Sequence, residues 1–278
     1  MNIQNTNMPK VALVTGASSG IGKAIALQLI SDGLIVYVAA RRVEKMRDLE
    51  QLGAIALKMD ITQEQDIKRV VEQIEREHDG VDILVNNAGY AIYGAMEDTT
   101  IEDARRQFEV NLFGLASLTQ AVLPQMRAKK SGKIVNISSI GGKIYSLLGS
   151  WYHATKHALE GWSDCLRLEL ASFNIDVIII EPGVIKTEFG DVTIPAMMKR
   201  SGNSAYSVMA KKIEKIIKSY NDPGNASDPS VIAKVVSQAI KAKKPKTRYV
   251  AGKLARPLIL MRKLLSDHLF DKIIMSTI

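Results

Sequence analysis

Tyr152 and Lys156 are the two residues of this sequence whose types and spacing point most directly to proton-transfer chemistry. They lie four residues apart in the stretch 151–173, which has the spacing of a helix, so both side chains share one face. A tyrosine with an ordinary pKa of about 10 is a poor base at neutral pH, and a nearby ammonium lowers that pKa because it stabilises the phenolate. Ser139 lies thirteen residues earlier, directly after a predicted buried strand, where its hydroxyl can hydrogen-bond a carbonyl oxygen beside Tyr152. Taken alone, a Tyr-x-x-x-Lys pair also fits an exposed helix surface.

A glycine-rich turn, Thr15-Gly16-Ala17-Ser18-Ser19-Gly20-Ile21-Gly22, lies between the first predicted strand and the first predicted helix. Glycines let the backbone approach a pyrophosphate closely, and a helix N-terminus offers it unpaired N–H donors and a positive dipole. The spacing is G-x-x-x-G-x-G, which differs from the common G-x-G-x-x-G fingerprint. Tight strand–helix turns also use glycine, but the position at the first such turn favours a nucleotide site.

The end of the second predicted strand indicates which dinucleotide is bound. This fold usually places an acidic residue about 20 positions after the glycine turn, where it holds the ribose 2′-hydroxyl. Residues 34–42 contain no carboxylate, and the strand is followed by Arg41 and Arg42. Guanidinium groups pair with phosphate through forked, charge-assisted hydrogen bonds, so the sequence predicts NADP(H) rather than NAD(H). The alternative is a pair of solvated arginines at a helix start.

Short apolar runs that fit buried strands alternate with runs that fit helices from Lys10 to about Ile180. The predicted strands are 11–15, 34–39, 54–59, 82–86, 133–137 and 176–180, and the predicted helices are 20–32, 43–52, 63–78, 101–129 and 151–173. This order predicts a single Rossmann-type doubly wound parallel sheet of about seven strands, with helices on both faces. The ligand crevice of such a sheet lies at the carboxyl ends of its strands.

Beyond Pro182 the pattern loosens. We expect a helical substrate flap at 187–226, a helix at 230–244 that begins near Asp228, and a last strand at 247–251. Residues 253–278 combine apolar positions at helical spacing with basic residues, and predict an amphipathic C-terminal helical extension. We expect one domain over residues 1–278, with a cofactor-binding and catalytic core at 9–186.

The composition is that of a globular protein of a reducing compartment. The chain has 278 residues, of which 46% are apolar and 24% charged. Cys165 is its only cysteine, so an internal disulfide is excluded and no cysteine-based metal cluster is expected. The polar first ten residues do not resemble a signal peptide, and no apolar run is long enough to span a membrane. We therefore expect a cytoplasmic protein without a metal site.

The net charge of +8 is unevenly distributed. Residues 196–278 carry 17 basic and 5 acidic side chains, whereas the preceding part is slightly acidic. The basic part is either a solvated surface or attracted to an anionic partner such as a membrane surface. Nucleic acid is not expected, because the lysines are scattered and no zinc-finger, RNP or basic-zipper signature is present.

Together these motifs resemble the short-chain dehydrogenase/reductase family from about Pro9 to Thr187. Thr15–Gly22 is similar to the family's TGxxxGxG turn, 86–89 (Asn-Asn-Ala-Gly) to its NNAG segment, and 182–187 to its PGxxxT segment. The resemblance implies a catalytic tetrad, which is Asn111, Ser139, Tyr152 and Lys156. It also implies a cofactor-binding set, which is Gly16, Ser18, Ser19, Gly20, Ile21, Gly22, Arg41, Arg42, Asp60, Ile61, Asn87, Ala88, Gly89, Tyr152, Lys156, Pro182, Gly183, Ile185 and Thr187.

The family's mechanism agrees with this residue chemistry. It implies that NADPH delivers a hydride to a carbonyl carbon while Tyr152 gives its proton to the developing alkoxide. Ser139 would polarise the carbonyl, Lys156 would lower the pKa of Tyr152 and hold the nicotinamide ribose, and Asn111 would support a proton-relaying water. The family also implies a homodimer or homotetramer, which often pairs the two long helices predicted at 101–129 and 151–173.

Three functional interpretations stay open. The segments 139–142, 158–161 and 248–249 most resemble the 17β-hydroxysteroid dehydrogenase/retinol dehydrogenase-like branch, which acts on lipophilic ketones and alcohols. A 3-oxoacyl-carrier-protein reductase is similar over the core but usually ends near its last strand, whereas about 25 residues follow Gly252 here. A nucleotide-sensing binding protein is the non-enzymatic alternative, although it has no need for Ser139, Tyr152 and Lys156 together.

The remaining candidates carry less weight. Apolar residues around the crevice predict a lipophilic substrate, although each also fits ordinary packing: Tyr93, Met96, Tyr145, Leu148, Met197 and Met198.

His153 should face away from Lys156, because neighbours in a helix point about 100° apart. We expect Cys165 to be a small buried residue of the helix. We expect the tail either to pack against the protein or to lie on a membrane surface, where its contact would be weak.

Overall fold

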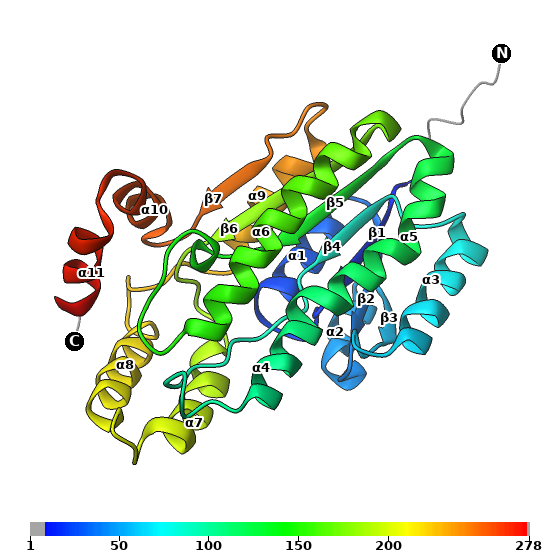
Figure 1. Cartoon of the computed structure of the whole chain (residues 1–278). Coiled ribbons are helices and arrows are strands. Elements are labelled where there is room, and N and C mark those ends of the chain that lie inside the picture. The colour runs from blue at the N-terminus through cyan, green and yellow to red at the C-terminus, as the bar shows by residue number, and fades with distance from the viewer. Residues whose placement is uncertain (1–8, 277–278) are drawn as a thin grey trace.

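Residues 9–276 are described by a computed structural model, and within them seven parallel strands form one sheet in the order β3-β2-β1-β4-β5-β6-β7 (Figure 1). The strands are β1 (Val11–Thr15), β2 (Ile35–Ala40), β3 (Ile55–Lys58), β4 (Ile83–Asn86), β5 (Gly132–Ile137), β6 (Ile175–Pro182) and β7 (Arg248–Ala251). The order reverses between β1 and β4, which places the predicted ligand crevice at the carboxyl ends of these two strands. The doubly wound fold is confirmed.

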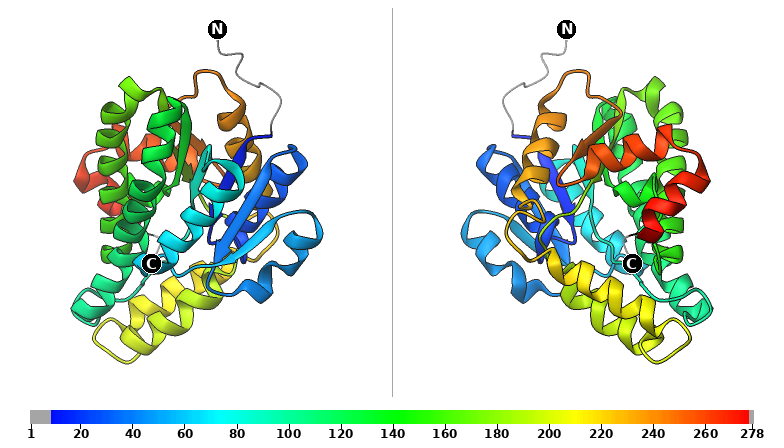
Figure 2. Two further views of the ribbon diagram at one scale, coloured as in Figure 1. Left: turned by 90° about the vertical axis from the view of Figure 1, so that its right-hand side faces the viewer. Right: turned by 90° about the vertical axis from the view of Figure 1, so that its left-hand side faces the viewer.

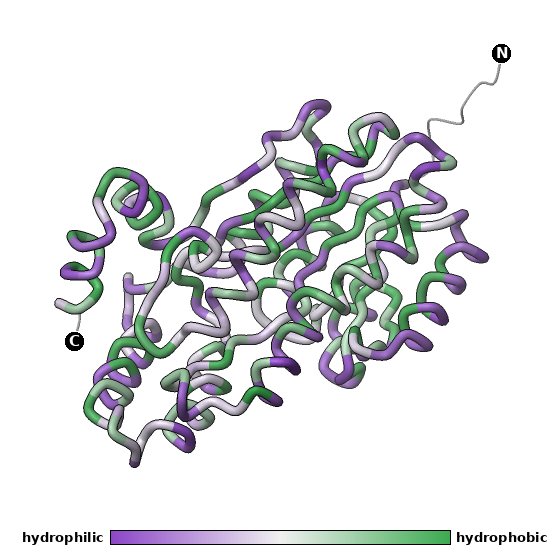
Figure 3. Tube along the Cα trace, in the orientation of Figure 1, coloured by the Kyte–Doolittle hydropathy of each residue, from purple (hydrophilic) through white to green (hydrophobic). Residues whose placement is uncertain are grey.

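Helices cover both faces of the sheet (Figures 1 and 2). They are α1 (Gly20–Ser31), α2 (Arg47–Gln51), α3 (Glu64–His78), α4 (Ile101–Phe108), α5 (Leu115–Lys129), α6 (Ser150–Leu170), α7 (Phe189–Ser201), α8 (Ser207–Ser219), α9 (Ser230–Lys241), α10 (Ala255–Leu264) and α11 (Asp267–Ser276). Alternate residues of β1 face opposite sides: Ala12 and Val14 pack with α1 and α9, while Val11 and Leu13 pack with α3, α5 and α6. This two-sided burial explains why the strands are short continuous apolar runs (Figure 3).

Two predicted helices differ in their hydrogen-bond pattern from a plain α-helix. The stretch 101–129 is helical throughout, as predicted, but it consists of α4, a π-helical turn at Glu109–Gly114 and then α5. At Gly114 this turn lies against the loop after β3, where a Cβ would come within 2.4 Å of the Ile61 carbonyl oxygen. The stretch 43–52 begins as a 3-10 turn at Val43–Met46 before α2, because Lys45 N–H bonds the Arg42 carbonyl three residues back.

The flap is the helical pair α7 and α8, which lie together at one end of the molecule (Figures 1 and 2). The tail is two helices rather than one, because Leu265 adopts an extended conformation between α10 and α11. Phe270 of α11 is fully buried, its ring centroid 5.1 Å from that of Tyr145. The same helices expose Leu260, Leu264 and other apolar side chains. Within residues 9–276, no helix has the length and apolar character needed to cross a bilayer.

Candidate active site

Ser139 and Tyr152 meet at the carboxyl end of β5. Ser139 directly follows this strand region, and its Oγ accepts a hydrogen bond from Gly141 N–H at 3.0 Å. Tyr152 lies in the first turn of α6, and its phenol interacts with the Ser139 hydroxyl, which lowers the tyrosine pKa. The sequence prediction that a strand end and a helix N-terminus bring these two hydroxyls together agrees with the geometry.

Burial, however, raises the pKa of Tyr152 above its ordinary value and outweighs the Ser139 contact. The structure shows the Ser139 contact lowering this pKa, and the role of the Lys156 ammonium in lowering it stays a prediction. A phenol whose pKa lies at or above about 10 keeps its proton at neutral pH. At neutral pH Tyr152 therefore carries a proton that it can donate to a reacting oxygen.

Lys156 lies one helical turn beyond Tyr152 and is largely buried. Its ammonium donates to the Ile137 carbonyl oxygen at 2.8 Å, which ties α6 to the end of β5. Burial lowers the pKa of Lys156 to about 8, because the charged form loses hydration, while the negative charge of Glu160 opposes the shift. A lysine with this pKa is still mostly charged at pH 7.

Asn111 is held by the π-helical turn Glu109–Gly114 and is almost fully buried. Its side-chain nitrogen donates to the Tyr90 carbonyl oxygen at 2.9 Å and to Thr155 Oγ1 at 3.1 Å, and its oxygen accepts from Tyr90 N–H. Asn111 therefore connects α6 to the loop after β4. Turns of this type are often found at functional sites, where they redirect one side chain.

The glycine turn is shaped by contacts with the loop after β4. Thr15 Oγ1 accepts hydrogen bonds from the backbone N–H groups of Asn87 and Ala88, both at 3.0 Å. Gly16 has φ +65°, and a Cβ there would lie 2.8 Å from the Ala88 Cα, so only glycine fits. A Cβ on Gly22 would lie 2.3 Å from the Asn87 side-chain nitrogen. The turn stays open on its other side, where its backbone faces a groove.

This groove has a volume of about 410 Å³ and crosses the carboxyl ends of β1 and β2. It is lined by nine of the predicted cofactor residues, which are Gly16, Ser18, Ser19, Arg41, Arg42, Asp60, Ile61, Ala88 and Gly89. The glycine backbone, two serine hydroxyls and two guanidinium groups fit a pyrophosphate with an additional phosphate group. The residues present therefore fit a phosphorylated dinucleotide.

Other predicted cofactor residues lie behind or beside the groove. Ile21, Gly22 and Asn87 pack within the protein next to the glycine turn. The segment of Pro182 and Gly183 continues to Thr187, whose side chain lies 3.2 Å from where a Cβ of Gly20 would be. The side chain of Ile185 is partly buried and packs against the core.

The sequence reasoning missed three charged residues that line the groove. Asp103 and Arg106 come from α4, and Arg200 comes from the flap helix α7. Arg200 forms an ion pair with Asp103 at 2.9 Å, which connects the flap to α4 at the groove edge. Their spacing of nearly a hundred residues carries no local signal, so only the folded arrangement shows them together.

Residues 10–197 match the sequence profile of the family described as short chain dehydrogenase. The chain belongs to this family. It is 36% identical to the 3-ketodihydrosphingosine reductase of Bacteroides thetaiotaomicron over 92% of each chain. It is 35% identical to the NADPH-dependent 3-dehydrocapnine reductase of Ornithobacterium rhinotracheale over 95% of each chain. A short-chain dehydrogenase structure from Streptomyces avermitilis superposes with a TM-score of 0.81 at 35% identity, over 96% of each chain.

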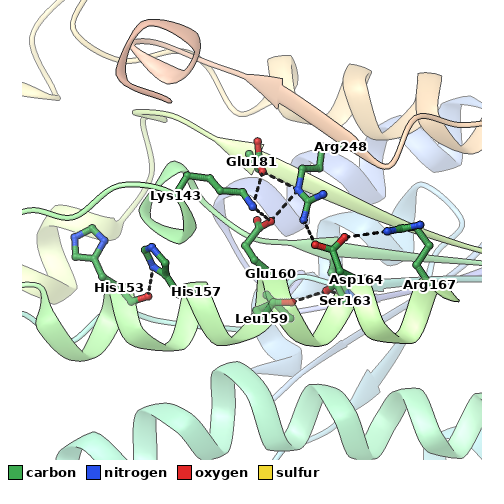
Figure 4. Close-up of polar contacts among 11 residues, drawn as sticks. Lys143, His153, His157, Leu159, Glu160, Ser163, Asp164, Arg167, Glu181 and Arg248 are labelled. Carbon is green, nitrogen blue, oxygen red and sulfur yellow. Dashed lines mark hydrogen bonds and ion pairs between the residues drawn. The ribbon is translucent and has the colours of Figure 1, made fainter. Parts of the chain in front are cut away.

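Behind the active site of this short-chain dehydrogenase lies a cluster of buried charges (Figure 4). It consists of Lys143 after β5, Glu160 of α6, Glu181 of β6 and Arg248 of β7. Glu160 Oε2 lies 2.8 Å from Lys143 Nζ and 3.0 Å from Arg248 Nε, and Arg248 Nε lies 3.3 Å from Glu181 Oε1. Burial raises the pKa of Glu181 to about 7, and repulsion from Glu160 adds to the shift while Lys143 and Arg248 oppose it. The cluster ties the loop after Ser139 to α6 and the last two strands.

An apolar cluster lies between the flap helices and the active-site loops of the dehydrogenase. Tyr93 belongs to it and places its ring 6.1 Å from that of Tyr152. The predicted residues Leu148, Met197 and Met198 are members of the same cluster. Two further predicted residues lie elsewhere: Met96 is exposed, and Tyr145 packs against the tail.

Cys165 is exposed, so its predicted burial is wrong. It lies on α6, but the buried face of that helix there is formed by Ser163, Leu166 and Leu170. A position next to a buried residue in a helix points about 100° away from it, which turns Cys165 outward.

Proposed function

We propose that this short-chain dehydrogenase uses NADP(H) to interconvert a lipophilic ketone or aldehyde and its alcohol. The observation that carries the proposal is the contact between the hydroxyls of Ser139 and Tyr152, in a molecule that also has an apolar cluster beside Tyr152 and a phosphate-compatible groove. A hydroxyl pair with a protonated phenol suits the reduction of a carbonyl group.

The groove residues favour NADP(H). Arg41 and Arg42 would hold the 2′-phosphate, and Gly16, Ser18 and Ser19 would hold the pyrophosphate. The relative from Ornithobacterium rhinotracheale is named as NADPH-dependent, which supports the same cofactor here. When bound, the nicotinamide supplies or accepts the hydride.

The chain's own residues would manage the proton and the carbonyl. The Tyr152 phenol gives its proton to the developing alkoxide oxygen, because burial keeps it protonated at neutral pH. The Ser139 hydroxyl donates to the same oxygen and polarises the carbonyl. Lys156 holds the nicotinamide ribose, and Asn111 supports the water that returns a proton through Lys156.

The substrate is proposed to be lipophilic, in the manner of the 17β-hydroxysteroid dehydrogenase/retinol dehydrogenase-like branch. Tyr93 lies next to Tyr152 and forms an apolar cluster with Leu148 and Met197. Two relatives are named for ketone reductions, of 3-ketodihydrosphingosine and of 3-dehydrocapnine. These names favour a ketone on a lipid-like molecule.

The test is the loss of nicotinamide absorbance with NADPH and with NADH across a panel of ketones. The panel contains steroid, retinoid and 3-oxoacyl compounds, 3-ketodihydrosphingosine, and small ketones as a polar control. We expect turnover with NADPH that is confined to one lipophilic class. Turnover of the 3-oxoacyl compounds alone would favour the carrier-protein reductase. Tight NADPH binding without any turnover would favour a nucleotide sensor.

We further propose a cytoplasmic homodimer or homotetramer assembled through α5 and α6. Leu168 of α6 and Phe113, just before α5, are apolar and exposed on these elements. The burial of Phe270 favours packing of the tail over membrane contact as its main role. Light scattering after size exclusion tests the assembly, and flotation with anionic vesicles tests any weak membrane contact.

A further inference from the structure

His153 is buried beside Tyr152, and both of its ring nitrogens have partners. Nδ1 lies 2.9 Å from the Gly141 carbonyl oxygen, and Nε2 lies 2.8 Å from Ser146 Oγ. The sequence predicts only that this ring turns away from Lys156. The structure turns it into the loop that follows Ser139, which the sequence pattern does not reveal.

The partners determine which nitrogen carries the hydrogen. A carbonyl oxygen accepts hydrogen bonds and cannot donate them, so Nδ1 is the protonated nitrogen and Nε2 accepts from the Ser146 hydroxyl. Burial lowers the pKa of His153, which favours the neutral ring that this assignment needs. The ring therefore acts as a fixed connector, with one donor and one acceptor.

The ring is also held sterically between two glycines. A Cβ on Gly141 would lie 3.1 Å from Nδ1, and a Cβ on Gly149 would lie 2.9 Å from the ring carbon Cδ2. Both glycines therefore let the loop backbone approach the imidazole closely. The hydrogen bonds and this close packing fix the position of Gly141 relative to α6.

The contacts of His153 extend to both hydroxyls of the active site. Through Gly141 they reach Ser139, because Gly141 N–H donates to Ser139 Oγ at 3.0 Å. Through Ser146 they reach Tyr93, whose phenol interacts with the Ser146 hydroxyl and whose ring lies against Tyr152. The two paths therefore end on Ser139 and on Tyr93, both of which contact Tyr152.

We propose that His153 is a positioning residue that directs the Ser139 hydroxyl toward Tyr152 and the substrate carbonyl. Because Gly141 N–H occupies one lone pair of Ser139 Oγ, the serine O–H is left to donate toward the reacting oxygen. His153 keeps that N–H in place by anchoring the carbonyl of the same residue. The catalytic consequence rests on the proposed function, whereas the positioning of Ser139 does not.

The test compares His153→Leu with His153→Asn and with the control His157→Leu. Leucine has no polar atoms, whereas asparagine can keep a donor close to the position of Nδ1. His157 lies one turn further on the same helix, is exposed, and its Nδ1 lies 2.9 Å from the His153 carbonyl oxygen. Figure 4 shows the two histidine side chains side by side on α6.

We expect His153→Leu to lower kcat with NADPH by about tenfold to a hundredfold, because a small displacement of a catalytic group has that effect. The dissociation constant of NADPH should change less than about twofold, since His153 does not line the groove. His153→Asn should recover most of kcat, and His157→Leu should match the wild type. Equal kcat for His153→Leu and His157→Leu would overturn the proposal.

A second measurement needs neither turnover nor a known substrate. The ¹³Cζ NMR signal of Tyr152, assigned by its loss in Tyr152→Phe, reports the hydrogen bonding of the phenol. We expect this signal to shift in His153→Leu and in the milder variant Ser146→Ala, but not in His157→Leu. An unchanged signal in both variants overturns the proposal. A shift in a protein that reduces none of the ketones would leave the positioning role standing and refute the proposed function.

Discussion

Glu181 offers a quantitative test of the buried charge cluster, through the variant Glu181→Gln. Burial and the neighbouring Glu160 raise the pKa of Glu181 from an ordinary 4.5 to about 7 in the folded protein. Between these pH values the folded protein holds a proton that the unfolded chain has released, so the free energy of unfolding falls as pH rises from about 4.5 to about 7. Above pH 7 Glu181 is charged in the folded protein, so the free energy of unfolding is lowered by the full cost of burying that charge.

The pKa values set the size of the expected effect. A difference between 4.5 and about 7 corresponds to about 3 kcal/mol of lost stability at pH 8. Glutamine resembles the protonated carboxyl and does not titrate, but it also gives up the contact with Arg248 at 3.3 Å. We therefore expect the stability of Glu181→Gln relative to wild type to be higher at pH 8 than at pH 5 by about 1–3 kcal/mol.

The assay is urea unfolding of both proteins at pH 5 and pH 8, at one protein concentration. Glu169→Gln is the matched control, because it removes the same charge from an exposed position of α6. Its stability relative to wild type should differ little between the two pH values. If Glu181→Gln also shows no difference between pH 5 and pH 8, Glu181 ionises normally and the account of the cluster is refuted.

Three further perturbations address the cofactor groove and the tail. Replacing Arg41 and Arg42 together with alanine should reduce the ratio of kcat/KM for NADPH over NADH by about tenfold or more, and an unchanged ratio would exclude them as 2′-phosphate ligands. Gly22→Ala should destabilise the chain by about 2 kcal/mol or more in urea unfolding, because the new Cβ would lie within 2.5 Å of a backbone oxygen in the glycine turn. Phe270→Ala should release α11 from Tyr145 and speed proteolysis within the tail, whereas unaltered cleavage would mean that this contact does not hold it.

Much of the sheet could be predicted because parallel strands buried on both faces are short apolar runs. Val11–Thr15 is a strand with all five residues buried, and the other strands lie within two residues of the predicted ranges. Three of the catalytic residues follow the same logic, since Ser139 lies at a strand end and Tyr152 and Lys156 lie on the first turns of a helix. Ser139 and Tyr152 could thus be paired from the sequence alone.

The remaining features depend on contacts between segments far apart in the chain. Glu181 and Arg248 lie on the neighbouring strands β6 and β7. A single sequence does not show that Arg248 contacts both Glu181 and Glu160. The raised pKa of Tyr152 follows from burial by loops and flap, which no helical spacing indicates. The partners of His153 could not be predicted for the same reason, because they lie in a loop without a regular pattern.

The most direct test of the central claim is a single-turnover reduction by Tyr152→Phe, with NADPH and the best ketone of the panel. Phenylalanine keeps the ring against Tyr93 but removes the proton that the alkoxide needs. We predict a loss of about a hundredfold to ten-thousandfold in the rate of hydride transfer, with NADPH binding unchanged within about twofold. A rate equal to that of the wild type, with NADPH still bound, would contradict the assignment of Tyr152 as the proton donor.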